Sequence, residues 1–282
     1  MLPPLANTLF GVFIALCLFG LFTHALESKA TALTTSLSVR DQFKTFVNDM
    51  KKVFNPFLRK SLGNSKYLTQ KGLLEQIDDN YRYTAEESKK LSRTLHLSSS
   101  DYGQCLQNQN SAKVWRMAAG SGTYEGHGRT SLIIKSLPAQ KHASTLGEIK
   151  ALEIVGDLVD FGTDPVQGRP TIIMKRKTGL QLYETEEYKK ANYQQKKKLA
   201  MDTARLGCMK GAQDAFHKGV WHNDNHMYNI LVTFEKGAVI SVELIDYGEG
   251  PNFLVYGEAR SPHYMSIFYD WCIRLYGTPI GF

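Results

Sequence analysis

Residues 216–232 read FHKGVWHNDNHMYNILV, and a second informative stretch, VELIDYG, follows at residues 242–248. Among their polar side chains are Asp224, Asn229 and Asp246, which stand beside the apolar runs ILV and VELI. Apolar runs of this length favour two β-strands that form a hairpin. Such a hairpin would bring the two carboxylates and the amide together at one of its ends.

This trio of side chains suits magnesium and phosphate chemistry. Mg²⁺ prefers hard oxygen ligands and completes its shell with water and substrate phosphates, so one Asp and one Asn are enough protein ligands. The remaining Asp can orient a hydroxyl group and accept its proton.

The composition is that of a globular protein. The chain has 282 residues, of which 43% are hydrophobic and 22% charged. These values exclude disordered, collagen-like and coiled-coil proteins, and the length predicts about two domains or lobes. The net charge of +7 is compatible with anionic partners such as nucleotides or membranes, but we expect no nucleic-acid partner.

The N-terminus resembles a secretory signal. The first 26 residues carry no charged side chain, residues 9–22 form an apolar run, and Thr23-His24-Ala25 offers an approximate cleavage site. We expect a signal peptide at residues 1–25 and a secreted protein. An uncleaved membrane anchor at residues 9–22, which would make the membrane a partner, and a buried helix are the alternatives.

Four cysteines are present, with no CxxC pair and no zinc-type Cys/His spacing. Removal of the signal takes away Cys17 and leaves Cys105, Cys208 and Cys272. Either one disulfide plus one thiol, or three reduced core cysteines, would fit this count, and the second is the simpler expectation.

The remaining chain divides near residue 110. Residues 26–110 are predicted to be a helical N-terminal extension, with a polar linker at 27–40, an amphipathic helix at 43–58 and a polar helical stretch at 67–97. From residue 113 short β-like runs alternate with glycine-rich turns, which predicts an antiparallel sheet. Helices are expected at residues 148–155 and over most of 180–217.

The stretch His222-Asn223-Asp224-Asn225-His226-Met227-Tyr228-Asn229, followed by Asp246-Tyr247-Gly248, resembles the protein-kinase-like superfamily. That family has an HxDxxxxN catalytic loop and a metal-binding D-F-G triplet. The resemblance covers roughly residues 113–275. It implies that Asp224 orients the acceptor, that Asn229 and Asp246 bind Mg²⁺, and that His222 is a structural group bonded to backbone.

Further residues fit the same resemblance upstream. Lys135, in the run IIK, would hold the phosphates of ATP, and Glu148 would pair with it. The segment GSGTY would be a shortened glycine-rich loop, with Gly120 and Gly122 next to the phosphates. Residues 174–177 resemble the segment between lobes that binds adenine, and its predicted nucleotide-binding residues are Met174, Lys175 and Lys177.

The resemblance implies an α+β, two-lobed kinase-like fold. A small antiparallel-sheet N-lobe would span residues 111–177 and a truncated, mainly helical C-lobe residues 178–282, after the N-terminal helices. Only 36 residues follow Asp246, and this truncation resembles the minimal kinases that some pathogens secrete into host cells. Asn223 replaces the Arg that reads a phosphorylated activation loop in many kinases.

We therefore expect a secreted enzyme that moves the γ-phosphoryl group of ATP, with Mg²⁺, to a Ser, Thr or Tyr hydroxyl of a protein. The resemblance to secreted minimal kinases makes a host protein a candidate acceptor. Two alternatives stay open. The D-x-H-x-x-N pattern at Asp224, His226 and Asn229 resembles aminoglycoside and choline phosphotransferases, which implies a small-molecule acceptor. The irregular glycine-rich loop and the shortened C-lobe would also fit a pseudokinase that acts as a binding module.

Overall fold

The computed structural model describes residues 65–76, 84–108, 113–137, 143–248 and 252–276. The predicted signal peptide at 1–25, the linker at 27–40 and the amphipathic helix at 43–58 lie outside these ranges. Within the described ranges, no helix combines the length and the apolar character needed to cross a membrane.

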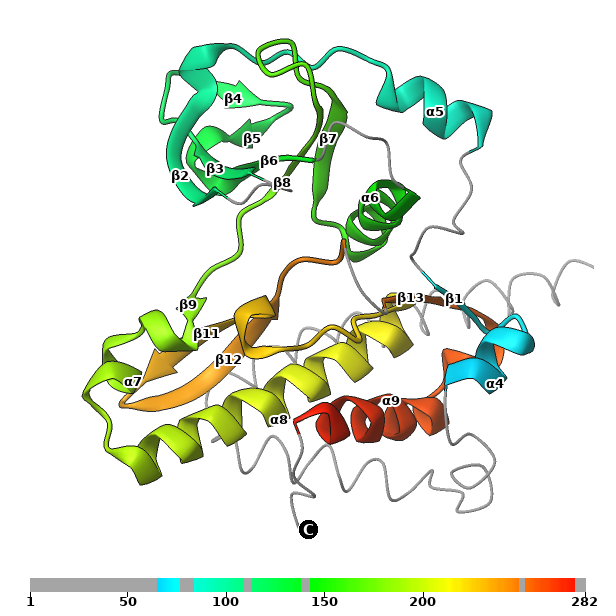
Figure 1. Ribbon diagram of the computed structural model, residues 1–282, viewed down its shortest axis with the longest axis vertical. Coiled ribbons are helices and arrows are strands. Elements are labelled where there is room, and N and C mark those ends of the chain that lie inside the picture. Colours follow the sequence, from blue (N-terminus) through cyan, green and yellow to red (C-terminus); the bar gives the residue numbers. More distant parts are fainter. Residues whose placement is uncertain (1–64, 77–83, 109–112, 138–142, 249–251, 277–282) are drawn as a thin grey trace, which may run out of the picture.

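The protein is α+β, as predicted, and its sheets are antiparallel. The largest sheet has five strands in the order β2-β3-β6-β8-β7. Figure 1 shows this sheet at the top of the molecule, together with helix α6 (Ala143–Val155). Its strands are β2 (Tyr102–Asn108), β3 (Lys113–Met117), β6 (Leu132–Ser136), β7 (Leu158–Thr163) and β8 (Pro170–Lys175).

Alternation along β6 and β8 gives the five-stranded sheet two apolar faces. Leu132 and Ile134 of β6 and Ile173 of β8 belong to a small core on one face. The preceding residue of β8, Ile172, belongs to the main core of the molecule instead. Because successive side chains of a strand point to opposite faces, Lys135, which is paired with Ile172, lies on the main-core side.

A helical portion lies below this sheet, where α8 (Tyr193–His217) and α9 (Pro262–Leu275) run side by side (Figure 1). A hairpin of β11 (Ile230–Glu235) and β12 (Ala238–Leu244) packs on α8. The chain passes from β8 to this portion at residues 176–179. The remaining elements there are β9 (Leu180–Gln181), α7 (Glu186–Lys190), β10 (Val220–Trp221) and β13 (Phe253–Val255).

The structure differs from the expected helical extension at residues 26–110. Within the described residues, β2 joins the five-stranded sheet, so that sheet begins at Tyr102 and not near residue 111. Strand β1 pairs with β13 in the helical portion. The polar pattern of residues 67–97 suggested one helix, but tertiary pairing divides this stretch into α4 (Ser65–Gln70), β1 (Leu74–Gln76) and α5 (Ala85–Leu91).

The glycine-rich turn between β3 and β6 folds back on itself. It contains the two-stranded hairpin of β4 (Thr123–Tyr124) and β5 (His127–Gly128). The predicted helical stretch at 180–217 is helical from Glu186 onward, but it opens with β9, which pairs with β11.

Candidate functional site

The Lys135 ammonium group joins three elements that are distant in sequence. Its Nζ donates hydrogen bonds to Oε1 of Glu148 at 2.7 Å and to Oδ1 of Asp246 at 2.8 Å. Lys135 lies on β6, Glu148 on α6, and Asp246 just after β12. These contacts therefore link the five-stranded sheet, its helix and the end of the hairpin.

This cluster is buried on the sheet side and open on the hairpin side. Lys135 is 9% exposed and Glu148 is 2% exposed, whereas the Asp246 side chain is about half exposed. Burial disfavours the charged ammonium, but the two carboxylates outweigh it and raise the pKa of Lys135 above its ordinary value. Burial likewise works to raise the pKa of Asp246, yet Lys135 holds it below its ordinary value. Lys135 and Asp246 are therefore both charged at neutral pH.

The main chain at Asp246 adopts a left-handed conformation next to this cluster. Asp246 has a φ of 63°, in the left-handed region, so the chain turns sharply after β12. Gly248 then passes close to Glu148, because a Cβ atom on Gly248 would lie 2.4 Å from Oε2 of that side chain. Only glycine fits there without displacing the partner of Lys135.

His222 contacts the two residues on either side of Asp246 in the same turn. Its Nε2 lies 2.8 Å from the carbonyl oxygen of Ile245, and its ring packs against Tyr247 with centroids 4.6 Å apart. Burial lowers the pKa of His222, so the ring is neutral and Nε2 must carry the proton that it donates to the carbonyl. The backbone hydrogen bond expected for His222 is confirmed.

Asp224 and Asn229 form a second polar pair at the same end of the hairpin. Nδ2 of Asn229 donates to Oδ2 of Asp224 at 3.1 Å and to its main-chain oxygen at 3.0 Å. The Asn229 carbonyl also accepts from the N–H of Ile245 at 3.0 Å, which places this pair one residue from Asp246. Asn229 is buried, whereas the Asp224 carboxylate is partly exposed.

Aromatic rings and His226 lie next to this pair. Nε2 of His226 is 3.7 Å from Oδ2 of Asp224, and the His226 ring contacts the exposed Tyr228. Tyr228 packs on Tyr183, which is also exposed, with ring centroids 5.3 Å apart. The partly exposed Asp224 carboxylate is therefore bordered by an aromatic surface.

The predicted nucleotide-binding residues lie in two different parts of the structure, a turn and the end of β8. Gly120 and Gly122 lie in the turn between β3 and β4, where Gly122 has a φ of 91°. Met174 and Lys175 end β8, and Lys175 Nζ donates to the Gly156 carbonyl at 2.8 Å. Lys177 Nζ lies 2.5 Å from Oδ2 of Asp157 and 3.6 Å from Oε2 of Glu243. The contacts recorded for both lysines run to the sheet's edge and the hairpin, not to the Lys135 cluster.

The donor set fits a hard cation. Asp246 and Asn229 offer a carboxylate and an amide oxygen at one end of the hairpin, and Mg²⁺ completes such a set with water and phosphate oxygens. No group of three or more His, Cys, Asp or Glu side chains within the described ranges could hold a metal ion by itself. Any Mg²⁺ here would depend on a phosphate ligand.

The cysteines follow the disulfide alternative and not the expected set of three reduced core thiols. Cys208 of α8 and Cys272 of α9 form a disulfide with Cα atoms 5.4 Å apart, and Cys105 is exposed. The count alone could not choose between the alternatives. Packing of α8 against α9 brings the two sulfurs together across 64 residues of sequence.

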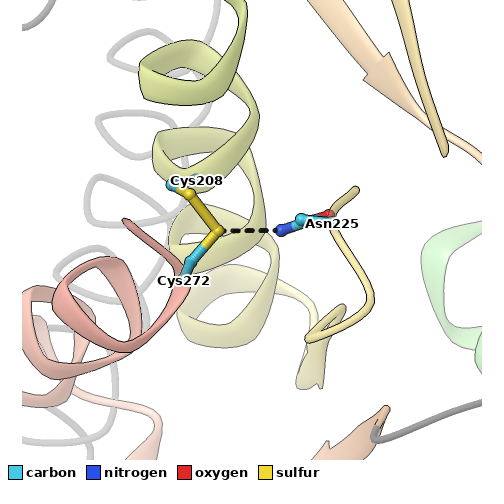
Figure 2. The surroundings of a disulfide bond; sticks show 3 residues. All are labelled: Cys208, Asn225 and Cys272. Atoms are coloured by element: carbon cyan, nitrogen blue, oxygen red, sulfur yellow. Dashed lines mark hydrogen bonds between the residues drawn. A yellow bond between two sulfur atoms is a disulfide. The ribbon is translucent and has the colours of Figure 1, made fainter. Parts of the chain in front are cut away.

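Sequence reasoning missed Asn225 and the glycines of α8. Asn225 is buried beside Asp224 and contacts the disulfide, as Figure 2 shows. A Cβ atom on Gly207 would lie 2.5 Å from the Ile230 side chain, and one on Gly211 would lie 2.7 Å from Nδ2 of Asn225. Two glycines four residues apart within a helical pattern are the signal that predicts such close packing.

A scan against protein-family models finds no match, and no curated protein matches.

Proposed function

We propose that this protein is a kinase-like phosphotransferase with two lobes, which moves the γ-phosphoryl group of ATP to a protein hydroxyl. The five-stranded sheet with α6 would be the N-lobe, and the portion built on α8 and α9 the truncated C-lobe. ATP and Mg²⁺ would bind between Lys135 and the end of the hairpin.

One observation carries the proposal, the Lys135 ammonium held between Glu148 and Asp246. Buried charges are costly, and a well-packed apolar cluster would stabilise a simple scaffold at least as well. A lysine fixed by two carboxylates, one of them half exposed, is instead suited to bind phosphate oxygens. The neighbouring Asp224–Asn229 pair supplies a second group for the acceptor.

The residues would divide the reaction between them. Lys135 would bind the phosphates, with Glu148 keeping its ammonium in place. Asp246 and Asn229 would hold Mg²⁺, which when bound neutralises charge on the phosphates. Asp224 would orient the acceptor hydroxyl and receive its proton as the oxygen bonds to the γ-phosphorus and the bond to the leaving oxygen of ADP breaks. Positioning and charge stabilisation would supply most of the rate.

Two isosteric variants test this division. Asp224→Asn should leave Mg-ATP affinity unchanged and lower phosphoryl transfer by roughly 10²-fold or more, because it removes the positioned base. Asp246→Asn should lower both, because it removes a charged metal ligand. Calorimetric titration with Mg-ATP and incorporation of labelled phosphate into a cell lysate provide the two measurements. Equal loss of ATP affinity in both variants, or full transfer by Asp224→Asn, would contradict the assignment.

The aromatic surface beside Asp224 favours a second candidate, a small-molecule acceptor. Exposed tyrosine rings at 183 and 228 and the imidazole of His226 could stack on a ring-bearing alcohol. The same assay separates the two functions, because label would pass through a size filter in one case and stay with protein in the other. ATP binding without any transfer would indicate a pseudokinase.

The disulfide also supports secretion. Disulfides persist in oxidising compartments and are rare in the cytosol, so the Cys208–Cys272 bond fits a protein that leaves the reducing interior of the cell. This agrees with a cleaved signal peptide at residues 1–25.

A further inference from the structure

The disulfide lies directly beneath the loop that carries Asp224. Nδ2 of Asn225 donates a hydrogen bond to Sγ of Cys272 at 3.4 Å, as Figure 2 shows. Both cysteines are buried, and Asn225 is 1% exposed. The residue next to the proposed base is therefore anchored on a covalent link between α8 and α9.

Helix α8 is shaped to receive this anchor. Gly211 lies one turn after Cys208, and a Cβ atom there would come within 2.7 Å of Nδ2 of Asn225 and 3.6 Å of the His222 carbonyl. The missing side chain lets Asn225 reach the helix surface. The Asn225 side chain is thus held between the backbone of α8 at Gly211 and the disulfide.

The side-chain amide of Asn225 uses only part of its capacity to form hydrogen bonds. Within the described residues, its buried Oδ1 accepts no hydrogen bond, so the bond from Nδ2 to sulfur is the polar contact that fixes it. An amide that is buried with half of its bonding capacity unused lowers stability relative to an apolar side chain of the same size. Its presence next to Asp224 therefore points to a role in the site and not to packing.

We propose that Cys208, Cys272 and Asn225 form a brace that positions Asp224 and Asn229, so that phosphoryl transfer depends on the intact disulfide. This inference rests on the proposed function, and it deepens it by adding a redox requirement at the same site. Asn225 is a positioning residue, because it acts through its neighbours and not on the substrate.

The chemistry of the brace follows from its atoms. Reduction by a dithiol breaks the bond between the two sulfurs, which take up two electrons and two protons, while the dithiol closes to its own disulfide. The two thiols must then move apart to non-bonded contact. Asn225 loses the fixed sulfur on which it rests, and the loop from His222 to Asn229 gains freedom. The enzyme would consequently transfer phosphate faster where the disulfide is oxidised than where it is reduced.

Two independent variants test the brace. Asn225→Leu keeps the volume and removes the hydrogen bond, whereas the double variant Cys208→Ala/Cys272→Ala removes the covalent link. In each, we expect kcat at saturating Mg-ATP to fall at least about 10-fold, since misplacing a reacting group by about 1 Å can cost 10²-fold. The dissociation constant for Mg-ATP should rise by a smaller factor than that by which kcat falls, because Lys135 and Asp246 lie outside the brace and only Asn229 of the proposed nucleotide and metal ligands is positioned by it.

A control separates positioning from general loss of stability. Ile267→Val removes one methyl group from a buried residue of α9 that takes no part in the disulfide or in its hydrogen bond with Asn225, and should leave kcat unchanged. Amide hydrogen exchange of residues 222–229 is measured alongside, and should be faster in both brace variants than in Ile267→Val. If the double cysteine variant does not fold, the kcat and the exchange rates of Asn225→Leu are sufficient to test the brace.

The outcomes distinguish the brace from the proposed function. If the wild-type protein transfers phosphate and Asn225→Leu does so equally fast, the brace is overturned and the proposed function stands. If the wild-type protein transfers none, the proposed function fails, and the exchange rates still judge the brace: unchanged rates overturn it, and faster rates in both variants support it as the element that orders this loop.

Discussion

At the scale of single residues, the contacts around Lys135 depend on a glycine. Gly248 passes so close to Glu148 that any side chain would push the carboxylate away from the ammonium. The position of the Glu148 carboxylate therefore depends on the lack of a side chain at Gly248 as well as on its hydrogen bond with Lys135.

Gly248→Ala should consequently weaken the cluster. We expect a loss of about 1–3 kcal/mol in the free energy of unfolding, typical of overpacking, together with a lower affinity for Mg-ATP. Gly128→Ala is the matched control, because a Cβ atom there would have its nearest neighbour 3.9 Å away and the φ of −59° suits any residue. Urea unfolding and calorimetric titration measure the two effects. Equal behaviour of the two variants would refute the close contact.

His222 makes stability depend on pH in a defined window. Burial lowers the pKa of His222 in the folded protein, so as pH falls below about 6.5 the unfolded chain takes up a proton that the folded chain does not. The free energy of unfolding should therefore be highest above about pH 6.5 and fall toward pH 5. The low pKa of Asp246 acts in a separate window, below about pH 4.

His222→Gln tests this titration. Glutamine has no charged form and can still donate a hydrogen bond toward the Ile245 carbonyl. The variant should lose less stability than the wild-type protein between about pH 7 and pH 5, as measured by urea unfolding at each pH. Parallel curves would show that His222 is protonated equally in both states.

At the scale of elements, α8 is the support of the site. Its buried face contacts α9, and its glycines admit the hairpin and the Asp224 loop. It begins with a capping box, in which Asn192 accepts from the N–H of Gln195 at 3.0 Å and the Gln195 side chain accepts from the N–H of Asn192 at 2.8 Å.

Asn192→Ala should lower the free energy of unfolding by about 1 kcal/mol, because it leaves the N–H of Gln195 without its cap. Denaturant unfolding measures the change. Tyr193→Ala is the control, since its ring is 77% exposed and the capping bonds remain. Mg-ATP binding should be the same in both, because the capping bonds join Asn192 and Gln195 and involve no residue of the Lys135 cluster or of the Asp224–Asn229 pair. A loss in the control as large as in Asn192→Ala would argue against the cap.

At the scale of the whole molecule, the Lys135 contacts link the sheet to the helical portion. A ligand that bridges Lys135 and Asp246 would bind only when both portions are folded and in place. Binding should therefore raise the stability of the entire chain and not of one part.

ATP at about 100 times its dissociation constant should raise the free energy of unfolding by about 2.7 kcal/mol in the presence of Mg²⁺. Thermal unfolding monitored with Mg²⁺ and with a chelator gives the comparison. The chelator should reduce the shift in the wild-type protein but have little effect on Asp246→Asn, which has lost a metal ligand. A shift that is independent of Mg²⁺ in the wild-type protein would exclude the metal site proposed for Asp246 and Asn229.

The sequence alone determined the local features of this protein. Short β-like runs between glycine-rich turns predicted antiparallel strands after residue 113, and the apolar runs around Asp224, Asn229 and Asp246 predicted their convergence at one end of a hairpin. These inferences succeed because strand pairing across a short turn is a local property, set by the pattern of side chains. The backbone contact of His222 was predicted from the family resemblance, and the structure confirms it.

Only the tertiary structure decided what depends on long-range packing. The pairing of Cys208 with Cys272, the contact of Asn225 with that disulfide and the pairing of β1 with β13 join residues far apart in the chain. A pattern within one segment carries no information about which distant segment covers it, so polar residues 67–97 read as one helix until their partners were in place. The geometry around Lys135 is of the same kind, because strand, helix and hairpin reach it only when the whole core has formed.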